Sequence, residues 1–514
     1  MNKAVIAAGH ALTAEAAQHI LQAGGNAADA MVAALFTACV VEPVLASLGG
    51  GGFALVQAAA GGKAELLDFF TQTPLHKTSP EDADFYAATV DFGSATQDFH
   101  IGTGSIATPG MISGLFELHR RHGSLPMREL TAFAAQQAKQ GVPICAYQGY
   151  ILSLVEPIFL STPAAKQLYE SANQTNKVLQ ASELLVNPAL ADTLEILGLE
   201  GERLFYEGEI AAAMCAQCAQ GGHLQTQDLL DYRTELRHPL TFHYKDWQIL
   251  TNPPPAAGGS LISFALSLLQ TLAPHLGRFA SREHVLAVRE ALALTQEARL
   301  ANTLANGIPD FLALADPALI QRYQAEVLQR SRAYRGTTHI SILDAQGNAV
   351  SATVSNGEGC GHIVPGTGFM LNNMLGEEDL NPNGFFRWHC NERMSSMMSP
   401  TIAHHPQGDL MVLGTGGSNR IRSAIVQVLL NLLHYELSVT EAVDAARLHV
   451  EQDMTYIEGG FSTEAAQALI EYSPAYRQWD QQNMFFGGVH TVTRRKGQST
   501  GAGDSRRGGV AVVV

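Results

Sequence analysis

Residues 336–356, GTTHISILDAQGNAVSATVSN, contain two runs of alternating polar and apolar residues joined by turn-forming residues. This pattern predicts an antiparallel β-hairpin whose loop spans residues 344–348. Pairing Leu343 with Ala349 brings like faces together and fixes the rest of the register. The facing polar pairs, about 5 Å apart, are then Ser341 with Ser351, His339 with Thr353 and Thr337 with Ser355. A hydroxyl therefore faces a hydroxyl where the first strand begins.

The hairpin alone has an ordinary explanation, because threonine and serine are common on the half-solvated faces of strands. Eight further segments change that interpretation. In chain order they are GGNAADA at 24–30, VEPVLASLGGGGFALV at 41–56, SIATPGMISGL at 105–115, PPPAAGG at 253–259, GTGFMLNNM at 366–374, MSSMMSPT at 394–401, GTGGSNRI at 414–421 and DSRRGG at 504–509. Each is weak evidence by itself, but the ordered set is specific. Together with the hairpin, the set resembles the γ-glutamyltranspeptidase family of N-terminal-nucleophile hydrolases across nearly the whole chain.

The resemblance implies that the chain cuts itself between Gly336 and Thr337, and that Thr337 becomes the catalytic nucleophile. A threonine hydroxyl is a poor nucleophile without an adjacent base, and a free N-terminal amine with a pKa of about 8 supplies one. Before cleavage the nitrogen of Thr337 is an amide without basicity, so the uncut chain is expected to be an inactive proenzyme. His339 lies two residues along the same strand, and we interpret it as structural.

The resemblance also assigns roles to the loops around this strand. Gly416 and Gly417 correspond to the family's oxyanion hole, where backbone N–H groups before a helix stabilise negative charge. A glycine pair before a helix is also common in tight turns, so this role depends on the neighbouring segments. Ser355, opposite the nucleophile, is expected to assist it. The residues that match the family's substrate-binding positions are Asn356, Glu377 or Glu378, Ser395 and Ser396.

One segment departs from the family. The family carries a D-[FY]-R-E motif whose arginine pairs with the α-carboxylate of the glutamyl donor, whereas this chain has Phe70 at that position, within DFFT at 68–71. Met374 likewise stands where the family has glutamine. Loss of the guanidinium removes a charge-assisted pair worth roughly several kcal/mol when desolvated, unless Arg387 or Arg393 replaces it. The sequence therefore supports the catalyst better than the glutamyl substrate.

The resemblance implies an α+β fold, the four-layer αββα sandwich in which helices cover two central sheets. Residues 1–336 are expected to form the large chain after cleavage and residues 337–514 the small chain, both within one αββα domain. Periodicity predicts helices over residues 13–23, 30–41 and 418–435, mostly helical structure over 113–236 and from 260 to about 334, and strands over 53–57, 410–413 and 509–514. A capping box from Ser438 to Glu441 predicts a further helix start.

The composition excludes several classes of protein. Of the 514 residues, 46% are hydrophobic and 16% are charged, so the chain can bury a large core. The formal net charge of -16 opposes binding to nucleic acid or to anionic membranes. The longest uncharged apolar run, residues 30–41, is too short to cross a bilayer. The N-terminus lacks an apolar signal region, so a cytoplasmic location is expected.

The six cysteines show no framework spacing, which is usual for reduced thiols inside a cell. Cys215 and Cys218 form a CxxC pair, but zinc requires a second pair of ligands and the surrounding alanine-rich stretch is typical of a helix. No metal and no cofactor are therefore expected.

Three functions stay open at the level of sequence. The first is γ-glutamyl transfer or hydrolysis, with glutathione as donor and water, an amino acid or a peptide as acceptor. The second is a related amidase or β-lactam acylase with another acyl group, which Phe70 and Met374 favour. The third is an uncleaved scaffold, against which the intact site motifs argue. Nucleotide binding at the glycine run 49–52 is weaker, since the run lacks G-x-G-x-x-G spacing and leads into a strand.

Overall fold

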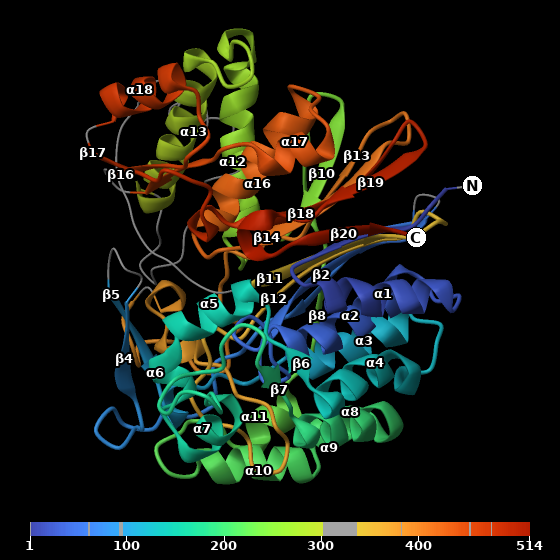
Figure 1. Ribbon diagram of the computed structural model, residues 1–514, viewed down its shortest axis with the longest axis vertical. Helices are drawn as coiled ribbons and strands as arrows, with labels where there is room; N and C mark the ends of the chain where they lie inside the picture. The colour runs from blue at the N-terminus through green and yellow to red at the C-terminus, as the bar shows by residue number, and fades with distance from the viewer. Residues whose placement is uncertain are drawn as a thin grey trace.

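Two β-sheets stacked face to face lie at the centre of the molecule, and helices cover both outer sides (Figure 1). The computed structural model describes residues 2–59, 62–91, 96–301, 337–381, 383–451, 454–473 and 475–514. Strand β14 of one sheet contacts β11 and β12 of the other, so the two sheets pack directly on each other. The four layers confirm the predicted αββα sandwich.

The first sheet has seven strands, all paired antiparallel. In spatial order they are β20 (Val510–Val513), β1 (Val5–Ala8), β11 (Thr338–Leu343), β12 (Ala349–Ser355), β2 (Gly51–Gln57), β3 (Glu65–Phe69) and β8 (Glu235–Arg237). The predicted hairpin register is confirmed, because Leu343 pairs with Ala349 and His339 with Thr353. Strand β1 was not predicted, although it lies between the edge strand β20 and β11 in this sheet.

The second sheet has six strands, also antiparallel. In spatial order they are β19 (Gln498–Ala502), β18 (Gly488–Arg495), β14 (Leu410–Gly416), β13 (Thr401–His404), β10 (Trp247–Thr251) and β9 (Leu240–Tyr244). Smaller sheets are formed by β15 (Leu448–Glu451), β16 (Met454–Ile457) and β17 (Ala475–Gln478), by β4 (Tyr86–Asp91) and β5 (Thr96–Ile101), and by β6 (Val142–Pro143) and β7 (Leu184–Leu185). The chain on each side of residue 337 contributes strands to both large sheets.

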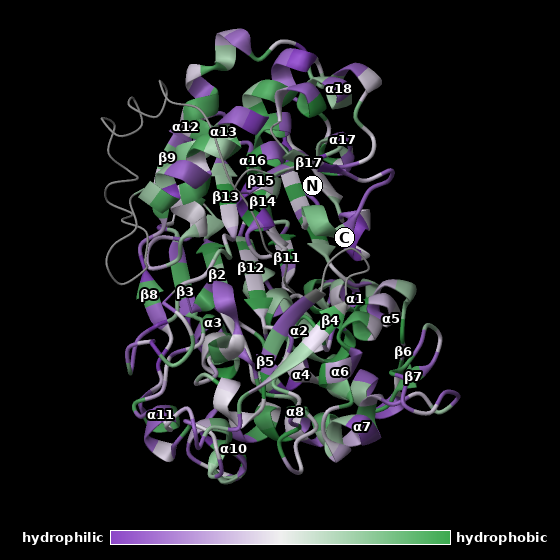
Figure 2. Cartoon of the chain, turned by 90° about the vertical axis from the view of Figure 1, so that its left-hand side faces the viewer, coloured by the Kyte–Doolittle hydropathy of each residue, from purple (hydrophilic) through white to green (hydrophobic). Residues whose placement is uncertain are grey.

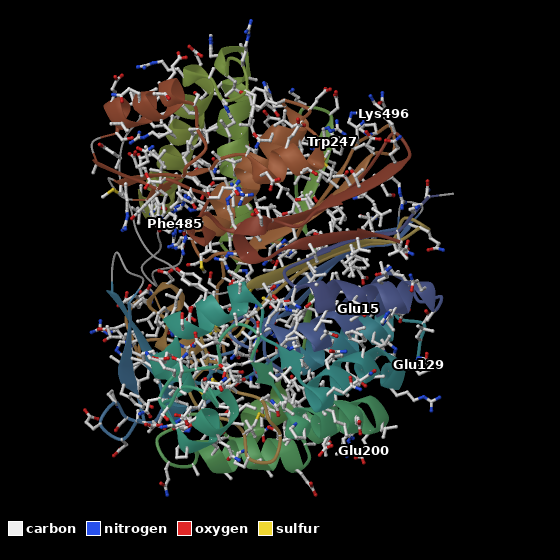
Figure 3. All side chains as sticks on the ribbon, in the orientation of Figure 1. Glu15, Glu129, Glu200, Trp247, Phe485 and Lys496 are labelled. Carbon is white, nitrogen blue, oxygen red and sulfur yellow. The ribbon has the colours of Figure 1, made fainter. Side chains whose placement is uncertain are left out.

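The helices below the first sheet come from the first half of the chain. They are α1 (Ala11–Gln22), α2 (Ala27–Val41), α3 (Met111–His122), α4 (Met127–Gln140), α5 (Ala146–Leu154), α6 (Glu156–Phe159), α7 (Pro163–Tyr169), α8 (Pro188–Glu200), α9 (Arg203–Tyr206), α10 (Glu209–Cys218) and α11 (Thr226–Asp231). Every residue of α2 is buried, and a capping box of Asn26 and Asp29 starts it earlier than predicted. Glu15, Glu129 and Glu200 of this layer are exposed to solvent and are labelled in Figure 3.

The helices above the second sheet are α12 (Gly258–Thr271), α13 (Arg282–Ala301), α16 (Arg420–Leu433), α17 (Val439–Asp444) and α18 (Thr463–Tyr472). Helix α16 begins two residues later than predicted, because Ser418 has a φ of 52° and cannot belong to a right-handed helix. The predicted capping box of Ser438 and Glu441 is confirmed at the start of α17. The predicted helical stretch after residue 301 lies outside the described residues up to residue 336.

Apolar residues concentrate in the two sheets and in helices such as α2 and α12, while hydrophilic residues gather at the periphery (Figure 2). The stretch 113–236 is mostly helical as predicted. The predicted end of this stretch is wrong, because residues 235–237 form the edge strand β8 that pairs with β3. Within the described ranges, no helix combines the length and apolarity that a bilayer span requires.

His339 connects the two sheets through a side chain that is fully buried. Its Nδ1 atom lies 2.8 Å from the hydroxyl of Thr353 and its Nε2 atom 2.9 Å from the hydroxyl of Ser341. Burial holds the pKa of His339 well below its usual value, so the ring is neutral. The ring packs against Gly414 of β14, where a Cβ atom would lie 2.4 Å from the imidazole. These contacts agree with a structural role.

Gly414→Ala is expected to destabilise the protein by about 1–3 kcal/mol, because the added methyl group overlaps an imidazole that cannot move between the sheets. Thermal unfolding of the purified variant measures this loss. In a double-mutant cycle, His339→Ala should relieve the overlap, so the double variant should lose less than the sum of the two single losses. Strictly additive losses would contradict the packing described here.

Candidate active site

Thr337 lies at the start of β11, between the two sheets, and is only 5% exposed. Thr338 pairs with Val354, so one further residue in this register sets Thr337 opposite Ser355, as predicted. Gly336, the other predicted side of the cleavage site, lies outside the described residues. The structure thus places the predicted nucleophile at a strand end, beside a second hydroxyl.

The glycine turn of the second sheet packs directly on Thr337. A Cβ atom on Gly416 would lie 1.8 Å from the carbonyl oxygen of Thr337, so only glycine fits there. Gly417 follows with a φ of 131°, a conformation that favours glycine. Thr415 fixes this turn, because its hydroxyl donates to the carbonyl of Gly416 at 2.7 Å and accepts the N–H of Gly488 at 2.8 Å.

This turn ends shortly before the N-terminus of α16, whose 14 residues add a helix dipole. Backbone N–H groups at such a position stabilise a developing oxyanion. The structure therefore brings Gly416 against Thr337, the predicted nucleophile, with Gly417 next in the chain, and the catalytic role of both glycines stays a prediction.

The loop after β12 brings together several predicted substrate-binding residues. The hydroxyl of Ser355 accepts the N–H of Gly357 at 3.1 Å. Glu377 is buried, and a Cβ atom on Gly357 would lie 2.3 Å from its Oε1 atom, whereas Glu378 is exposed. Of this predicted pair, only Glu377 therefore reaches the loop.

Asn356 is fully buried, and within the described ranges neither Oδ1 nor Nδ2 of its side chain has a hydrogen-bond partner. Buried amides are almost always satisfied, so an amide left without a partner beside Ser355 is suited to binding a polar ligand.

Ser395 and Ser396 lie on a loop that runs along the end of β3 rather than along β11. The N–H of Met394 donates to the carbonyl of Thr71 at 3.1 Å, which fixes the loop there. The hydroxyl of Ser395 donates to the carbonyl of Pro255 at 2.7 Å, and that of Ser396 accepts the N–H of Met398 at 3.1 Å. Each hydroxyl retains capacity for a further hydrogen bond to a substrate.

Phe70 lies at the same level of the first sheet as Thr337, three strands away across the register. Phe69 pairs with Gly52, so Phe70 falls next to Gly51, and Gly51 pairs with Ser355. The ring of Phe70 is buried and stacks on Phe53 with ring centroids 5.5 Å apart. Met374 and Met394 belong to the same apolar cluster. The region that carries an arginine in the family is therefore apolar here.

Arg393 is the cation beside Phe70, but it already has partners. Its guanidinium donates to the carbonyls of Phe70 and Arg233, each at 2.6 Å, and to the hydroxyl of Tyr232. It also lies 3.7 Å from Asp68 and 3.8 Å from Glu235, with a side chain that is 4% exposed. A substrate carboxylate would compete with two protein carboxylates, so the expectation that Arg393 replaces the family arginine is not supported.

Sequence reasoning missed one residue that touches Thr337, the predicted nucleophile. Arg507 donates from Nη1 to the carbonyl of Thr337 at 3.4 Å and is almost fully buried. The turn that carries it is held by Asp504, a buried carboxylate that accepts from Arg447 at 2.6 Å and from Arg506 at 3.2 Å. The stretch DSRRGG contained this signal, but only the structure shows its contact with β11.

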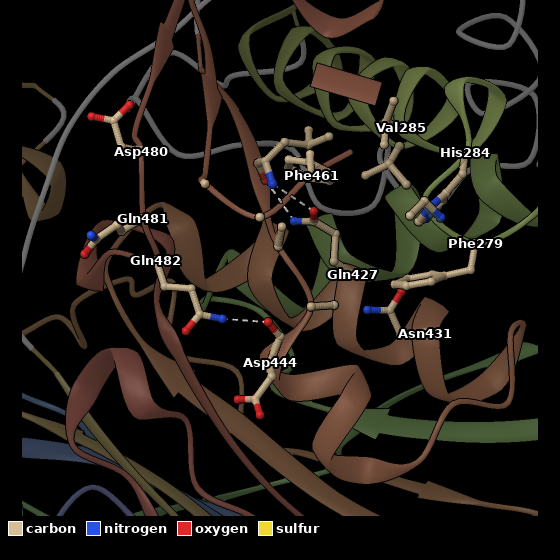
Figure 4. A pocket seen from close by; sticks show the side chains of 17 residues that line it. Phe279, His284, Val285, Gln427, Asn431, Asp444, Phe461, Asp480, Gln481 and Gln482 are labelled. Atoms are coloured by element: carbon tan, nitrogen blue, oxygen red, sulfur yellow. Dashed lines mark hydrogen bonds between the residues drawn. The ribbon is translucent and has the colours of Figure 1, made fainter. Parts of the chain in front are cut away.

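Two cavities in the described part of the chain lie away from Thr337. One of about 640 Å³ lies between α13, α16 and the loop around residues 480–482, with His284, Gln427 and Asn431 in its lining (Figure 4). Another of about 650 Å³ lies at the far end of the sheets, near His404 and Arg494. Neither lining includes a predicted site residue. In the same ranges, no cluster of three or more metal-ligating side chains occurs.

A threonine at a strand end, between two antiparallel sheets with helices outside, is the arrangement of an N-terminal-nucleophile hydrolase. Comparison with solved structures agrees, since cephalosporin acylase from Bacillus halodurans superposes with a TM-score of 0.83, covering 99% of this chain and 96% of that chain. At 22% identity this likeness concerns the fold alone.

Comparison of sequences shows the family. The profile of the family described as Gamma-glutamyltranspeptidase matches residues 13–514, so the chain belongs to this family. Glutathione hydrolase proenzyme of Pseudomonas aeruginosa is 30% identical, covering 98% of this chain and 93% of the relative. Acylase ACY 1 proenzyme of Pseudomonas sp. strain V22 is 28% identical, covering 91% and 86% respectively. Proteins named for hydrolysis of glutathione and proteins named as acylases are thus similarly close.

Ser355→Ala is expected to slow maturation or turnover by roughly 1–3 kcal/mol in activation free energy, because it removes the hydroxyl opposite Thr337. Ser351→Ala is the matched control on the same strand. The hydroxyl of Ser351 donates to the carbonyl of Leu413 at 3.0 Å and accepts the N–H of Thr401 at 3.1 Å, so its loss should lower the melting temperature instead. Equal effects of both variants on the rate would argue against a role for Ser355.

Proposed function

We propose that this chain is the proenzyme of an amide hydrolase or acyltransferase that matures by cleavage between Gly336 and Thr337 and forms its acyl-enzyme on Thr337. The observation that carries the proposal is the close contact of Gly416 with Thr337. Through this contact, the proposed nucleophile at a strand end lies against the glycine turn that precedes α16. The chain that carries this arrangement belongs to the family. The strand register, which sets Thr337 opposite Ser355, supports the same assignment.

The chemistry requires two rounds of the same attack. In the first, the hydroxyl of Thr337 attacks the carbonyl carbon of Gly336, its proton passes to the departing nitrogen, and water then hydrolyses the ester. This step releases the amine of Thr337 and the carboxyl group of Gly336. In the second, that amine takes the hydroxyl proton while the oxygen attacks a donor amide, and it returns the proton to the nitrogen of the donor amide, which departs as an amine when the acyl-enzyme forms. Gly416 and Gly417 would stabilise the oxyanion, and water or an amine would accept the acyl group.

For the donor, the family and the polar residues at the predicted substrate-binding positions support γ-glutamyl amides such as glutathione. The unsatisfied amide of Asn356, the buried carboxylate of Glu377 and the hydroxyls of Ser395 and Ser396 can bind the amino and carboxyl groups of a glutamyl donor.

A second candidate is an amidase or β-lactam acylase that accepts another acyl group. The observation that favours it is the buried stack of Phe70 on Phe53, together with the pairing of Arg393 to Asp68 and Glu235. Because these contacts are properties of this chain itself, we propose that γ-glutamyl amides are accepted but bound weakly, and that donors without the α-carboxylate are hydrolysed with a kcat/KM within about tenfold of theirs.

Purified protein is expected to separate into a large N-terminal and a small C-terminal fragment, with Thr337 as the first residue of the small one. Intact mass and N-terminal sequencing measure this outcome. Thr337→Ala should prevent both cleavage and turnover, because one hydroxyl performs both attacks. Thr337→Ser, which keeps a hydroxyl, should still be cleaved. A small fragment with another first residue, or full activity of an intact chain, would refute the assignment.

Four anilide donors test the acyl group, since they differ only in two substituents: γ-glutamyl, glutaryl without the amino group, 4-aminobutyryl without the carboxylate, and butyryl without both. Removal of the α-carboxylate should lower kcat/KM by less than about tenfold, whereas loss of a buried bidentate arginine pair would cost a hundredfold or more, as an order of magnitude. The expected KM for glutathione is correspondingly high.

A hundredfold preference for donors with the α-carboxylate, together with a low KM for glutathione, would overturn the proposal of weak glutamyl binding. It would show that another cation binds the carboxylate, and the primary assignment as a γ-glutamyl-transferring enzyme would then stand without the second candidate.

A further inference from the structure

The residue after the nucleophile is bound to a buried carboxylate on the opposite side of the sheet. The side chain of Thr338 points toward the helical layer, where its hydroxyl donates to Oε2 of Glu42 at 2.7 Å. Glu42 is fully buried at the C-terminal end of α2, and its other oxygen accepts from the hydroxyl of Thr13 of α1 at 2.9 Å. Residues 296 positions apart in the chain thus meet directly behind the candidate active site.

The backbone at the start of α1 closes this contact against water. A Cβ atom on Gly9 would lie 2.8 Å from Oε2 of Glu42 and 2.9 Å from the hydroxyl of Thr338, so any larger residue would separate them. A carboxylate without water is costly unless it is bound by donors, and a helix C-terminus is an unfavourable place for negative charge. Because burial of the Glu42 carboxylate is unfavourable, we expect this residue to have a role beyond packing.

The titratable groups around Glu42 do not neutralise it. They are Cys39 of α2, Tyr147 of α5 and His490 of β18, whose ring lies on the other side of Gly9. Burial raises the pKa of Cys39 and of Tyr147 and lowers that of His490 to about 4, so all three are uncharged near neutral pH. Burial raises the pKa of Glu42 itself to about 7, against the opposing effect of the two threonine hydroxyls.

We propose that Glu42 is a positioning residue for the nucleophile, acting through Thr338. The inference rests on the proposed function, because it assumes that Thr337 is the nucleophile. After cleavage Thr337 is a chain terminus, and termini fray unless they are tied down. Its own side chain and amine must stay free to react, so it can be fixed only through its carbonyl, which Arg507 binds, and through its neighbour Thr338. Glu42 belongs to the other fragment and would hold the new terminus from behind.

Ionised Glu42 accepts from both threonines at once. When it is protonated, it presents an O–H donor, so it can no longer accept two hydroxyl hydrogen bonds on equal terms. The alignment of Thr337 should therefore weaken as the pH falls through about 7, the pKa to which burial raises Glu42.

Two valine variants separate positioning from stability. Thr338→Val and Thr13→Val each remove one hydroxyl from the same carboxylate without changing side-chain shape, but only Thr338 adjoins the nucleophile. With the best anilide donor of the wild type, Thr338→Val should lower kcat roughly tenfold, the equivalent of one hydrogen bond, with KM changed less than about twofold. Thr13→Val should leave kcat within about twofold, although both variants lower the melting temperature. Thr338→Ser should restore kcat.

The pH dependence of kcat is an independent test, because a residue with only a structural role would not change it. The acid limb of the kcat profile should contain two titrations, that of the Thr337 amine at about pH 8 and that of Glu42 at about pH 7. Glu42→Gln should shift this limb by removing the second titration, and Thr13→Val should retain the wild-type limb. Equal loss of kcat in both valine variants, or wild-type kcat and an unshifted limb in Thr338→Val and Glu42→Gln, would overturn the inference. If the wild type itself is neither cleaved nor active, the proposed function fails first, and this outcome is distinct from the other two.

Discussion

The contact between Gly416 and Thr337 is the constraint on which the rest of the site depends. The turn of β14 approaches the start of β11 so closely that the space of one methyl group is already filled by a carbonyl oxygen. This approach requires that the two sheets stack at a fixed distance, which buried His339 and its partner Gly414 set further along the same strands. The active-site geometry is thus a consequence of how the sheets pack, because interiors are dense and adjust little.

Two buried polar systems support the first residues of β11 from opposite sides. On the side of the second sheet, Asp504 orders the turn that places Arg507 on the carbonyl of Thr337. On the helical side, Glu42 binds the hydroxyl of Thr338. Both are carboxylates removed from water, and each is stable only because several donors converge on it. Such systems are sensitive to the loss of a single partner, which makes them effective at fixing one geometry.

The part of the candidate site that is proposed to bind substrate combines polar and apolar side chains. Asn356 and Glu377 present buried polar groups near Ser355, whereas Phe70 and Phe53 form an apolar stack where the family has an arginine. A candidate site with polar groups near Ser355 and an apolar stack at Phe70 is compatible with acyl groups of several kinds. This matches the comparison, in which a glutathione hydrolase and an acylase are about equally similar to the chain.

The sequence by itself determined the hairpin register, the capping box of Ser438 and Glu441, and the position of Thr337 at a strand end, because alternation and capping act between near neighbours. Only the tertiary structure decided which distant groups meet. Strand β1 has four residues, too few for a periodic signal, and is a strand because β20 and β11 flank it. The pairing of Arg393 with Asp68, the exposure of Glu378 and the bond between Glu42 and Thr338 likewise depend on which side chains the packed layers enclose, and no local pattern encodes that.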